Sequence, residues 1–494
     1  MKKRFLSLIL ATLMLVFALA SCSGDDNTTD TDAPNNTVST ETGEQEMQPV
    51  FSGNTYDNRP FNVLCRKDTS NGIYESDINV ASYGNDATTV QKAVYNRNIV
   101  VEDILKIRFN FVSVVNTTIE NTISTSVLVG ETDSYDLIVA DGRTIFNGVL
   151  GKDYVDWTEL EYVNLDAPWW SQNAREEWTT VGDRLFAMNG DLSYMSVGSA
   201  NVMYFNRDIF ENNSNLISPY DHVKNNTWTL ESFKISVTDA DAAMAGEGDG
   251  SGNIKTDTFG YISQCWRGPI QAMYCAGIST LVKGGDGKYS IGLESLRFSD
   301  AFGAYDAIVQ SSSTYYTSSL SNARSGFTGG MGAYFDDNVS SAVNYSDSNL
   351  NFGIVPWPKY DAEVEGYNAL VGSGTNTFAV PQNTSAENRV RISEVLEAMA
   401  YYGYKEVISS YFDTVISYQA VQDQESYEML QIIHENLHFD LGHYANFGGI
   451  GDIGKNVVDK KDGYQTVSTA LTTIKKKVMD EFEVWYLLDV DEQE

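Results

Sequence analysis

The segment Tyr135-Asp136-Leu137-Ile138-Val139-Ala140-Asp141-Gly142 places a short apolar run directly before an acidic residue and a glycine. Four consecutive apolar residues flanked by polar ones are typical of a short buried strand. The Asp-Gly pair that follows marks the point where such a strand passes into a loop and then a helix. This segment therefore predicts one strand of a sheet whose other strands should lie nearby in the sequence.

The residues before this segment supply the rest of a strand and helix alternation. Residues 62–65 read as a buried strand, residues 86–105 have helical spacing with Asp86 as the candidate cap, and residues 107–115 read as a second strand. Strand, helix, strand, helix, strand predicts a parallel sheet. Ligands bind beyond the carboxyl ends of such strands, so the loops that start at Arg66 and Asp141 are where a site is expected.

The second half of the chain repeats the mixture of strands and helices. The expected elements are strands at 200–206, 351–358 and 378–381, a helix capped by Thr229, a loop at 239–253, and helices at 386–404 and 470–488. No tandem repeat of the solenoid kind is present. The body from residue 56 to 494 is long enough to bury a large core, and we expect two α/β lobes.

The amino terminus indicates export. Met1-Lys2-Lys3-Arg4 is followed by a mostly apolar run to Ala20 and by Leu19-Ala20-Ser21-Cys22, which resembles a lipoprotein processing site. We expect residues 1–21 to be a signal peptide, Cys22 to be lipidated, and residues 22–55 to be a flexible acidic tether. An uncleaved transmembrane helix is the alternative, but the apolar run is shorter than the roughly 20 residues that span a bilayer.

The charge of the chain argues against a nucleic-acid partner. The formal net charge is -34, with 67 acidic and 33 basic residues, and removal of the signal would make it more negative by three. Nucleic-acid affinity comes largely from Lys and Arg that neutralise phosphates. An acidic surface fits an exported domain better.

Three cysteines remain besides Cys22, and their spacing predicts no metal finger and no redox motif. Cys265 and Cys275 could pair across a short loop and leave Cys65 free, or all three could be reduced and buried. We expect no cofactor.

Several separated motifs resemble the extracellular solute-binding lipoproteins of bacterial ABC importers, in the carbohydrate-type family 1 group. They keep a consistent order from about Phe61 to Asp440. The motifs are Asn85-Asp86-Ala87, Tyr95-Asn96-Arg97-Asn98, Val101-Glu102-Asp103, Tyr135-Asp136-Leu137-Ile138, Asp156-Trp157-Thr158-Glu159-Leu160, Leu165-Asp166-Ala167-Pro168-Trp169-Trp170, Tyr204-Phe205-Asn206-Arg207-Asp208, Trp228-Thr229, Thr258-Phe259-Gly260, Phe352-Gly353-Ile354-Val355-Pro356-Trp357-Pro358-Lys359-Tyr360 and Ala379-Val380-Pro381.

This resemblance implies a two-lobed periplasmic-binding-protein fold of type II with a hinge between the lobes. Lobe 1 would comprise about 56–200 plus 350–390, and lobe 2 about 201–349 plus 391–494. The implied role is non-enzymatic: a monomer, held on the outer face of the cell membrane by the palmitate-bearing Cys22, captures a mono- or oligosaccharide and delivers it to ABC permease subunits. A ligand can close such lobes only by its higher affinity for the closed form, so both lobes must contact it.

A sugar site needs aromatic platforms and planar polar groups such as Asp, Arg and Asn. By similarity to maltose-type binding proteins, the resemblance points to several positions, each with a structural alternative. Asp141 could instead be a helix cap, Trp266 could be core, and Trp169 and Trp170 read as structural. The candidate ligand-binding residues are Asp141, Arg143, Trp266, Arg267, Tyr334, Phe335, Lys67, Asp68 and Ser373.

One motif favours a different function. His434-Glu435-Asn436-Leu437-His438 fits the zincin pattern, in which two histidines on one helix face bind Zn²⁺ and the glutamate acts as general base. His443 is one residue early for the third metzincin histidine, and no glutamate follows His438 until Glu481. A zinc-dependent surface protease is one alternative, and a glycan-binding surface lipoprotein without a permease is another.

Overall fold

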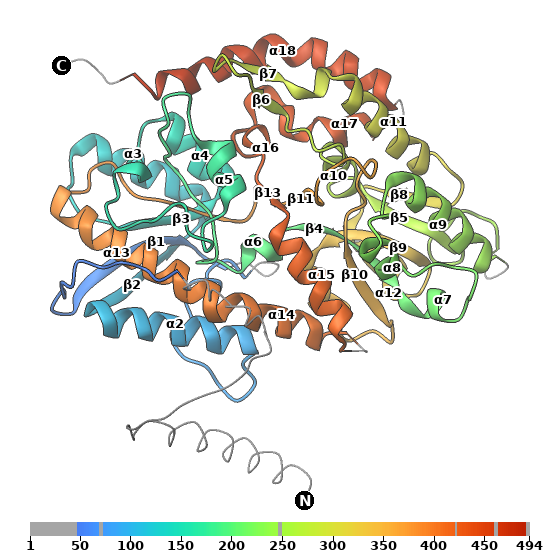
Figure 1. The fold of residues 1–494 in the computed structure, drawn as a ribbon, viewed down its shortest axis with the longest axis horizontal. Coiled ribbons are helices and arrows are strands. Elements are labelled where there is room, and N and C mark those ends of the chain that lie inside the picture. The colour runs from blue at the N-terminus through green and yellow to red at the C-terminus, as the bar shows by residue number, and fades with distance from the viewer. Residues whose placement is uncertain (1–46, 69–72, 246–248, 420–421, 459–462, 491–494) are drawn as a thin grey trace, which may run out of the picture. The chain divides into compact units, whose positions relative to one another are not determined.

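The computed structural model describes residues 47–68, 73–245, 249–419, 422–458 and 463–490 (Figure 1). Gln48–Glu494 forms one compact unit. The expected signal peptide, Cys22 and most of the expected tether lie outside the described residues. Among the helices of the described part, none combines the length and the apolar character that crossing a membrane requires.

The folded body begins earlier than the expected residue 56. Gln48 Oε1 accepts a hydrogen bond from Tyr401 Oη at 2.7 Å, and the backbone N–H of Ser52 donates to Glu394 Oε1 at 2.5 Å. Residues 48–52 therefore lie against a helix of the body instead of belonging to a free tether.

The first sheet contains the strand predicted at residues 137–140. The pairs β1–β2 and β1–β3 are parallel, as the alternation predicted, and the fourth strand joins β3 antiparallel. Buried aliphatic residues of β1 and β3 face helices on both sides, which explains their continuous apolar runs. In spatial order the strands are β12 (Asn376–Ala379), β3 (Leu137–Asp141), β1 (Arg59–Arg66) and β2 (Ile107–Val114).

The second sheet has five strands and mixed directions. β5 pairs parallel with β8 and with β9, while β4 pairs antiparallel with β9 and with β10. In order the strands are β10 (Phe352–Pro356), β4 (Asn201–Asn206), β9 (Gly332–Asn338), β5 (Phe259–Gln264) and β8 (Thr314–Thr317). Two short ribbons complete the strands: β11 (Ala369–Leu370) with β13 (Leu437–His438), and β6 (Leu281–Lys283) with β7 (Tyr289–Ile291).

Helices surround the two sheets (Figure 1). The longer ones are α2 (Thr89–Leu105), α3 (Ile119–Val129), α4 (Gly142–Leu150), α9 (Leu230–Ala243), α11 (Leu296–Val309), α12 (Leu320–Thr328), α13 (Ala386–Tyr402), α14 (Ile408–Ser417), α15 (Gln424–Glu435) and α18 (Gly463–Leu487). The shorter ones are α5 (Gln172–Trp178), α6 (Met195–Gly198), α7 (Arg207–Glu211), α8 (Pro219–Lys224), α10 (Gly268–Ala272), α16 (Leu441–Ala445) and α17 (Ile453–Val458), with 3₁₀ turns η4 (Val339–Asn344) and η6 (Phe447–Asp452) among the connections.

The chain passes between the two sheets in several places, so each sheet with its helices forms one lobe. The connections run from α6 to β4, from β10 through β11 to β12, and from α14 to α15. Beyond α15, α16 contacts α4 of the first lobe, whereas α17 and α18 contact α10 and α11 of the second.

The lobe boundaries differ from those expected. β10 belongs to the second sheet, so the return to the first lobe occurs at β12 and not at residue 350. α13 lies in the first lobe beyond residue 390, because Arg391 bonds to Asp136 and to the Pro60 carbonyl there. Apolar spacing predicts a helix but not the sheet against which it packs.

Two local expectations are also corrected. The N-cap of α2 is Thr88 and not Asp86: the Thr88 hydroxyl and the Gln91 side chain form a capping box. α9, capped by Thr229 as predicted, continues to Ala243 and therefore takes up the start of the expected loop at 239–253.

The three cysteines of the body, Cys65, Cys265 and Cys275, are buried and are not joined in disulfides. Cys265 and Cys275 are thus not a disulfide. Burial raises the pKa of Cys275 to about 12 and that of Cys65 to about 11, which makes both thiols inert at neutral pH.

Candidate ligand-binding site

Two adjoining cavities form a cleft between the lobes. The larger has a volume of about 400 Å³ and the smaller about 260 Å³. Arg267, Gly372 and Gly374 line both cavities and mark where they meet. The first lobe contributes Tyr74 and Asp141 to the walls, and the second contributes Arg267.

Strand direction explains why these residues meet. β5 and β9 run parallel, so their carboxyl ends at Gln264 and Asn338 share one edge of the second sheet. β1 and β3 likewise end together at Arg66 and Asp141. Polar side chains just beyond these ends therefore line the cleft, as expected for open α/β sheets.

Trp266 is the aromatic platform of the smaller cavity. Trp266 is 45% exposed, whereas the other seven tryptophans of the chain are buried. The Lys455 ammonium lies over the indole ring, 4.1 Å from its centroid. Core packing, the alternative for Trp266, is excluded by this exposure, and an exposed indole in a polar cleft suits stacking on the C–H face of a sugar.

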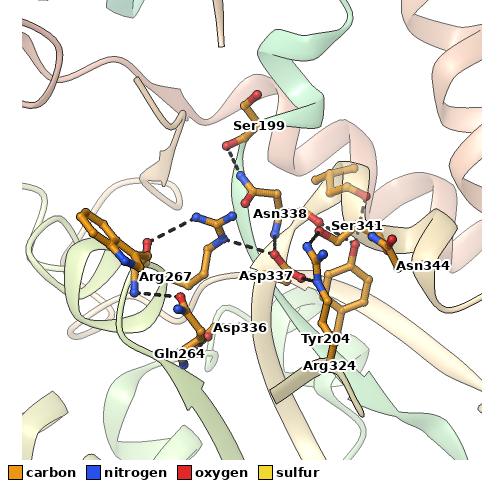
Figure 2. Close-up of polar contacts among 12 residues, drawn as sticks. Ser199, Tyr204, Gln264, Arg267, Arg324, Asp336, Asp337, Asn338, Ser341 and Asn344 are labelled. Atoms are coloured by element: carbon orange, nitrogen blue, oxygen red, sulfur yellow. Dashed lines mark hydrogen bonds and ion pairs between the residues drawn. The ribbon is translucent and has the colours of Figure 1, made fainter. Parts of the chain in front are cut away.

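A shared carboxylate organises the larger cavity, and Figure 2 shows Arg267 and Arg324 on either side of Asp337. Arg267 Nε donates to Asp337 Oδ1 at 3.2 Å and Arg324 Nε donates to Oδ2 at 2.8 Å. Tyr345 Oη donates to the same Oδ2 at 2.7 Å. Arg324 also bonds to Ser341 Oγ at 2.8 Å, so both guanidinium groups are held in defined positions.

Asp336 and Asp337 are neighbours on β9 and point to opposite faces of the sheet. Burial alone would raise the pKa of Asp337, but Arg267 and Arg324 outweigh it and hold that pKa below its usual value. Asp336 has no cation beside it, and burial raises its pKa to about 8. One carboxyl is therefore ionised at neutral pH and its neighbour is protonated.

This contrast predicts a pH dependence of stability. Between pH 4 and pH 8 folded Asp336 retains a proton that the unfolded chain has lost, so stability falls as pH rises. We expect Asp336→Asn to remove this contribution, so that the wild-type free energy of unfolding falls by about 1 kcal/mol more than the variant's from pH 6 to pH 7. Urea unfolding of both proteins at pH 6 and pH 7 measures these free energies. An equal change in the free energy of unfolding for the two proteins would contradict the prediction.

A glycine lets the loop that carries Trp266 and Arg267 approach the sheet. A Cβ at Gly268 would stand 2.5 Å from Asp336 Oδ2 and equally near two hydroxyl oxygens. Only glycine allows α10 to begin this close to β9, and this close approach places Arg267 beside Asp337.

The segment 372–374, which connects the lobes, forms the floor of the cleft. The Ser373 N–H donates to His443 Nε2 at 3.1 Å, so the proton of this imidazole resides on Nδ1, which donates to the Gly451 carbonyl at 3.3 Å. Burial lowers the pKa of His443, so the ring is neutral and its tautomer is set by these two bonds. Ser373 thus lines the smaller cavity through a fixed backbone.

Asp141 and Arg143 both line the smaller cavity and both have structural partners. Asp141 caps α4 by accepting the Thr144 N–H at 3.0 Å, and it also accepts from the Asn116 side chain. The Arg143 guanidinium pairs with Asp452 at 2.7 Å. Asp141 is therefore a helix cap and a cleft residue at once.

Two polar atoms of the smaller cavity's lining residues have no protein partner. Among the described residues, Asn201 Oδ1 and Arg143 Nε are buried and without a hydrogen bond. Neither atom is accessible from the cavity, so a ligand hydroxyl could pair with them only after a side chain moves.

The remaining candidates lie elsewhere. Tyr334 and Phe335 are fully buried because β9 is a central strand covered on both faces, and Tyr334 Oη bonds to Ser236 Oγ at 2.6 Å. Lys67 is exposed outside both cavities. Asp68 accepts hydrogen bonds from Glu75 and Ser76, as a loop residue does.

Sequence reasoning missed most of the larger cavity. Its polar wall comes from the end of β9, from α12, from η4 and from the residue after α6 (Figure 2). Asn338 Nδ2, for example, donates to the Ser199 carbonyl at 2.6 Å. The Asp336-Asp337 pair after two aromatics was the one available signal. The missed lining residues include Tyr74, Ser199, Arg324, Asn338, Ser341, Asn344, Asn201, His443 and Asp452.

The alternative prediction that His434 and His438 bind Zn²⁺ is wrong. α15 ends at Glu435, and Leu437–His438 is a strand paired with β11, so the two histidines do not share a helix face. His434 Nε2 bonds to Asp191 Oδ1 at 2.8 Å, and His438 is buried against Tyr274. Within the described residues no group of three candidate ligands could hold a metal ion.

Several solved structures share this fold over most of the chain. The cyclo/maltodextrin-binding protein complexed with maltotetraose aligns with a TM-score of 0.55 at 12% identity, over 86% of this chain and 98% of that one. UgpB from Mycobacterium tuberculosis, in complex with glycerophosphocholine, aligns with a TM-score of 0.51 at 12% identity, over 79% of this chain and 95% of that one. The GacH receptor of Streptomyces glaucescens, solved unliganded and with acarbose, aligns with a TM-score of 0.51 at 11% identity, over 86% of this chain and 98% of that one.

No family model and no curated protein matches the sequence. The structural likeness establishes the two-lobed fold of solute-binding proteins, as predicted.

Proposed function

We propose that this chain is the lipid-anchored, extracellular solute-binding component of an ABC importer, which captures a carbohydrate between its lobes and delivers it to a membrane permease. The protein binds its ligand without transforming it. Solved proteins of the same fold include one complexed with maltotetraose and one with acarbose, which supports this substrate class.

The observation that carries the proposal is the composition of the cleft. Trp266 offers a half-exposed indole, and the polar residues Asp141, Arg143 and Asn201 line the same cavity. Carbohydrate recognition needs this combination of an apolar platform and fixed donors and acceptors.

The position of the cleft supplies the mechanism. Its walls come from both lobes, and residues 372–374 on its floor lie in a connection between them. A ligand that contacts both walls binds the closed form more tightly than the open form and shifts the population towards closure. The closed, loaded form would then be what the permease recognises.

Thermal unfolding of the purified protein against a carbohydrate panel tests this function. A sugar present at about 100 times its dissociation constant should add about 2.7 kcal/mol of stability and raise the melting temperature. Peptides and amino acids serve as controls. If they raise the melting temperature while no sugar does, the proposed substrate class is wrong.

The anchor and the permease are the parts of the proposal that depend on sequence alone. The basic start, the apolar run and Cys22 support lipidation at the outer face of the membrane. Permease genes beside this gene would favour import over retention of glycans at the surface.

A further inference from the structure

The wall of the larger cavity is cationic in a strongly acidic protein. The chain holds 67 Asp and Glu against 33 Lys and Arg. Among the described residues, the lining of the larger cavity nevertheless includes Arg267 and Arg324 and no acidic residue, and its other polar members are Ser, Thr, Asn and Tyr. Such a reversal of charge marks a surface suited to an anion.

The two guanidinium groups are not neutralised by their partner. They share the single carboxylate of Asp337, so one positive charge remains. The Asp337 side chain is 0% exposed, whereas those of Arg267 and Arg324 are 27% and 29% exposed. The negative charge therefore lies behind the wall and the positive charges face the cleft.

A third cation lies behind the opposite wall of this cavity, which the first lobe contributes. Arg66 is buried and bonds to neutral acceptors, the Asn376 side chain at 2.8 Å and the Gly374 carbonyl at 2.5 Å. Its guanidinium stacks 3.5 Å from the ring centroid of Tyr74, which lines the cavity. The carboxylates that interact electrostatically with it are those of Asp68, Asp77 and Asp141, of which Asp141 lines the smaller cavity and none lines the larger one.

We propose that the natural ligand is an anionic carbohydrate, whose carboxylate, sulfate or phosphate group binds between Arg267 and Arg324 while a neutral ring stacks on Trp266. This inference rests on the proposed function and narrows its substrate class. Guanidinium groups held by an ion pair present their remaining N–H donors in the planar geometry that an oxyanion accepts. Ser341, Asn338 and Asn344 supply neutral polar groups to the same wall.

Matched pairs of sugars test the inference on the unmodified protein. The probes are trigalacturonate and the neutral trisaccharide made by reducing its carboxyl groups, galactose 6-sulfate with galactose, and glucose 6-phosphate with glucose. We expect at least one acidic member to bind about 10-fold or more tightly than its neutral partner in calorimetry. Its affinity should fall as NaCl rises from 50 to 300 mM, whereas that of a neutral sugar should not.

A variant and a matched control locate the effect. Arg324→Met should abolish the preference for the acidic member. Arg184 is the control because its side chain is also 29% exposed and pairs with a buried carboxylate, that of Asp156, away from both cavities. Arg184→Met should keep the preference.

The outcomes separate this inference from the proposed function. Binding of neutral sugars with no acidic preference would overturn the inference and leave the function standing. Binding of none of the sugars in either test would overturn both. A preference that persists in folded Arg324→Met and Arg267→Met variants would overturn the assigned position. If a variant does not fold, the wild-type pairs and their salt dependence still decide.

Discussion

Replacing Trp266 with alanine is expected to weaken carbohydrate binding by about 30-fold or more. Truncation of a central aromatic at a binding surface typically costs at least about 2 kcal/mol, which corresponds to this factor. Trp266 meets the description because it is the exposed tryptophan of the chain and it lines the cleft between the lobes. Titration calorimetry with the best sugar from the panel measures the loss.

Tyr83→Ala is the matched control for this variant. Tyr83 is also 45% exposed, and it contacts Tyr95 edge-on at 5.2 Å outside both cavities. Its removal should leave affinity unchanged. Equal affinity of a folded Trp266→Ala protein and the wild type would remove Trp266 from the site, and Trp266→Phe should retain part of the binding because it keeps an aromatic face.

Replacing Arg391 with methionine is expected to destabilise the first lobe by about 3–5 kcal/mol. Arg391 bonds to Asp136 Oδ1 at 2.6 Å, and the two side chains are 2% and 1% exposed. Asp136 Oδ2 also accepts the Asn62 N–H at 2.7 Å, so this carboxylate connects β1, the start of β3 and α13. Loss of the guanidinium leaves a buried charge without its counterion, and urea unfolding measures the cost.

The same helix provides the control. Arg389 pairs with Glu159, but these side chains are 24% and 55% exposed, and an exposed pair contributes at most about 1 kcal/mol. Arg389→Met should therefore have a much smaller effect. Adding Asp136→Asn to Arg391→Met should recover part of the stability, because the uncompensated charge is gone. Equal losses of unfolding free energy in Arg391→Met and Arg389→Met would contradict the view that burial of the Arg391–Asp136 pair causes the larger effect.

Local patterns identified most of the first sheet. The strands predicted at 62–65, 107–115 and 137–140 are β1, β2 and β3, and the prolines after residue 355 end β10. The runs in β1 and β3 are reliable signals because a strand buried on both faces is apolar nearly throughout, whereas β2 is an edge strand with alternating polar and apolar residues. The start of α2 was placed two residues early, since Asp86 and Thr88 are both good caps and only the observed bonds choose between them.

The candidate site was only partly visible in the sequence. Asp141, Arg143, Trp266, Arg267 and Ser373 do meet at the cleft, because each follows a strand end or lies in a connection between lobes. Tyr334 and Phe335 looked equally suitable, but β9 is central in its sheet and buries both. Strand order is decided by contacts across the whole chain, which local spacing does not encode.

By itself, therefore, the sequence determined the alternation of strands and helices, the acidic character of the chain and the cleft residues nearest to strand ends. Only the tertiary structure decided that α15 stops before His438 and that Arg324 reaches Asp337. The physical reason is distance along the chain. A helix cap or a strand face depends on neighbours within a few residues, whereas a shared carboxylate or a lobe boundary depends on residues that folding alone brings together.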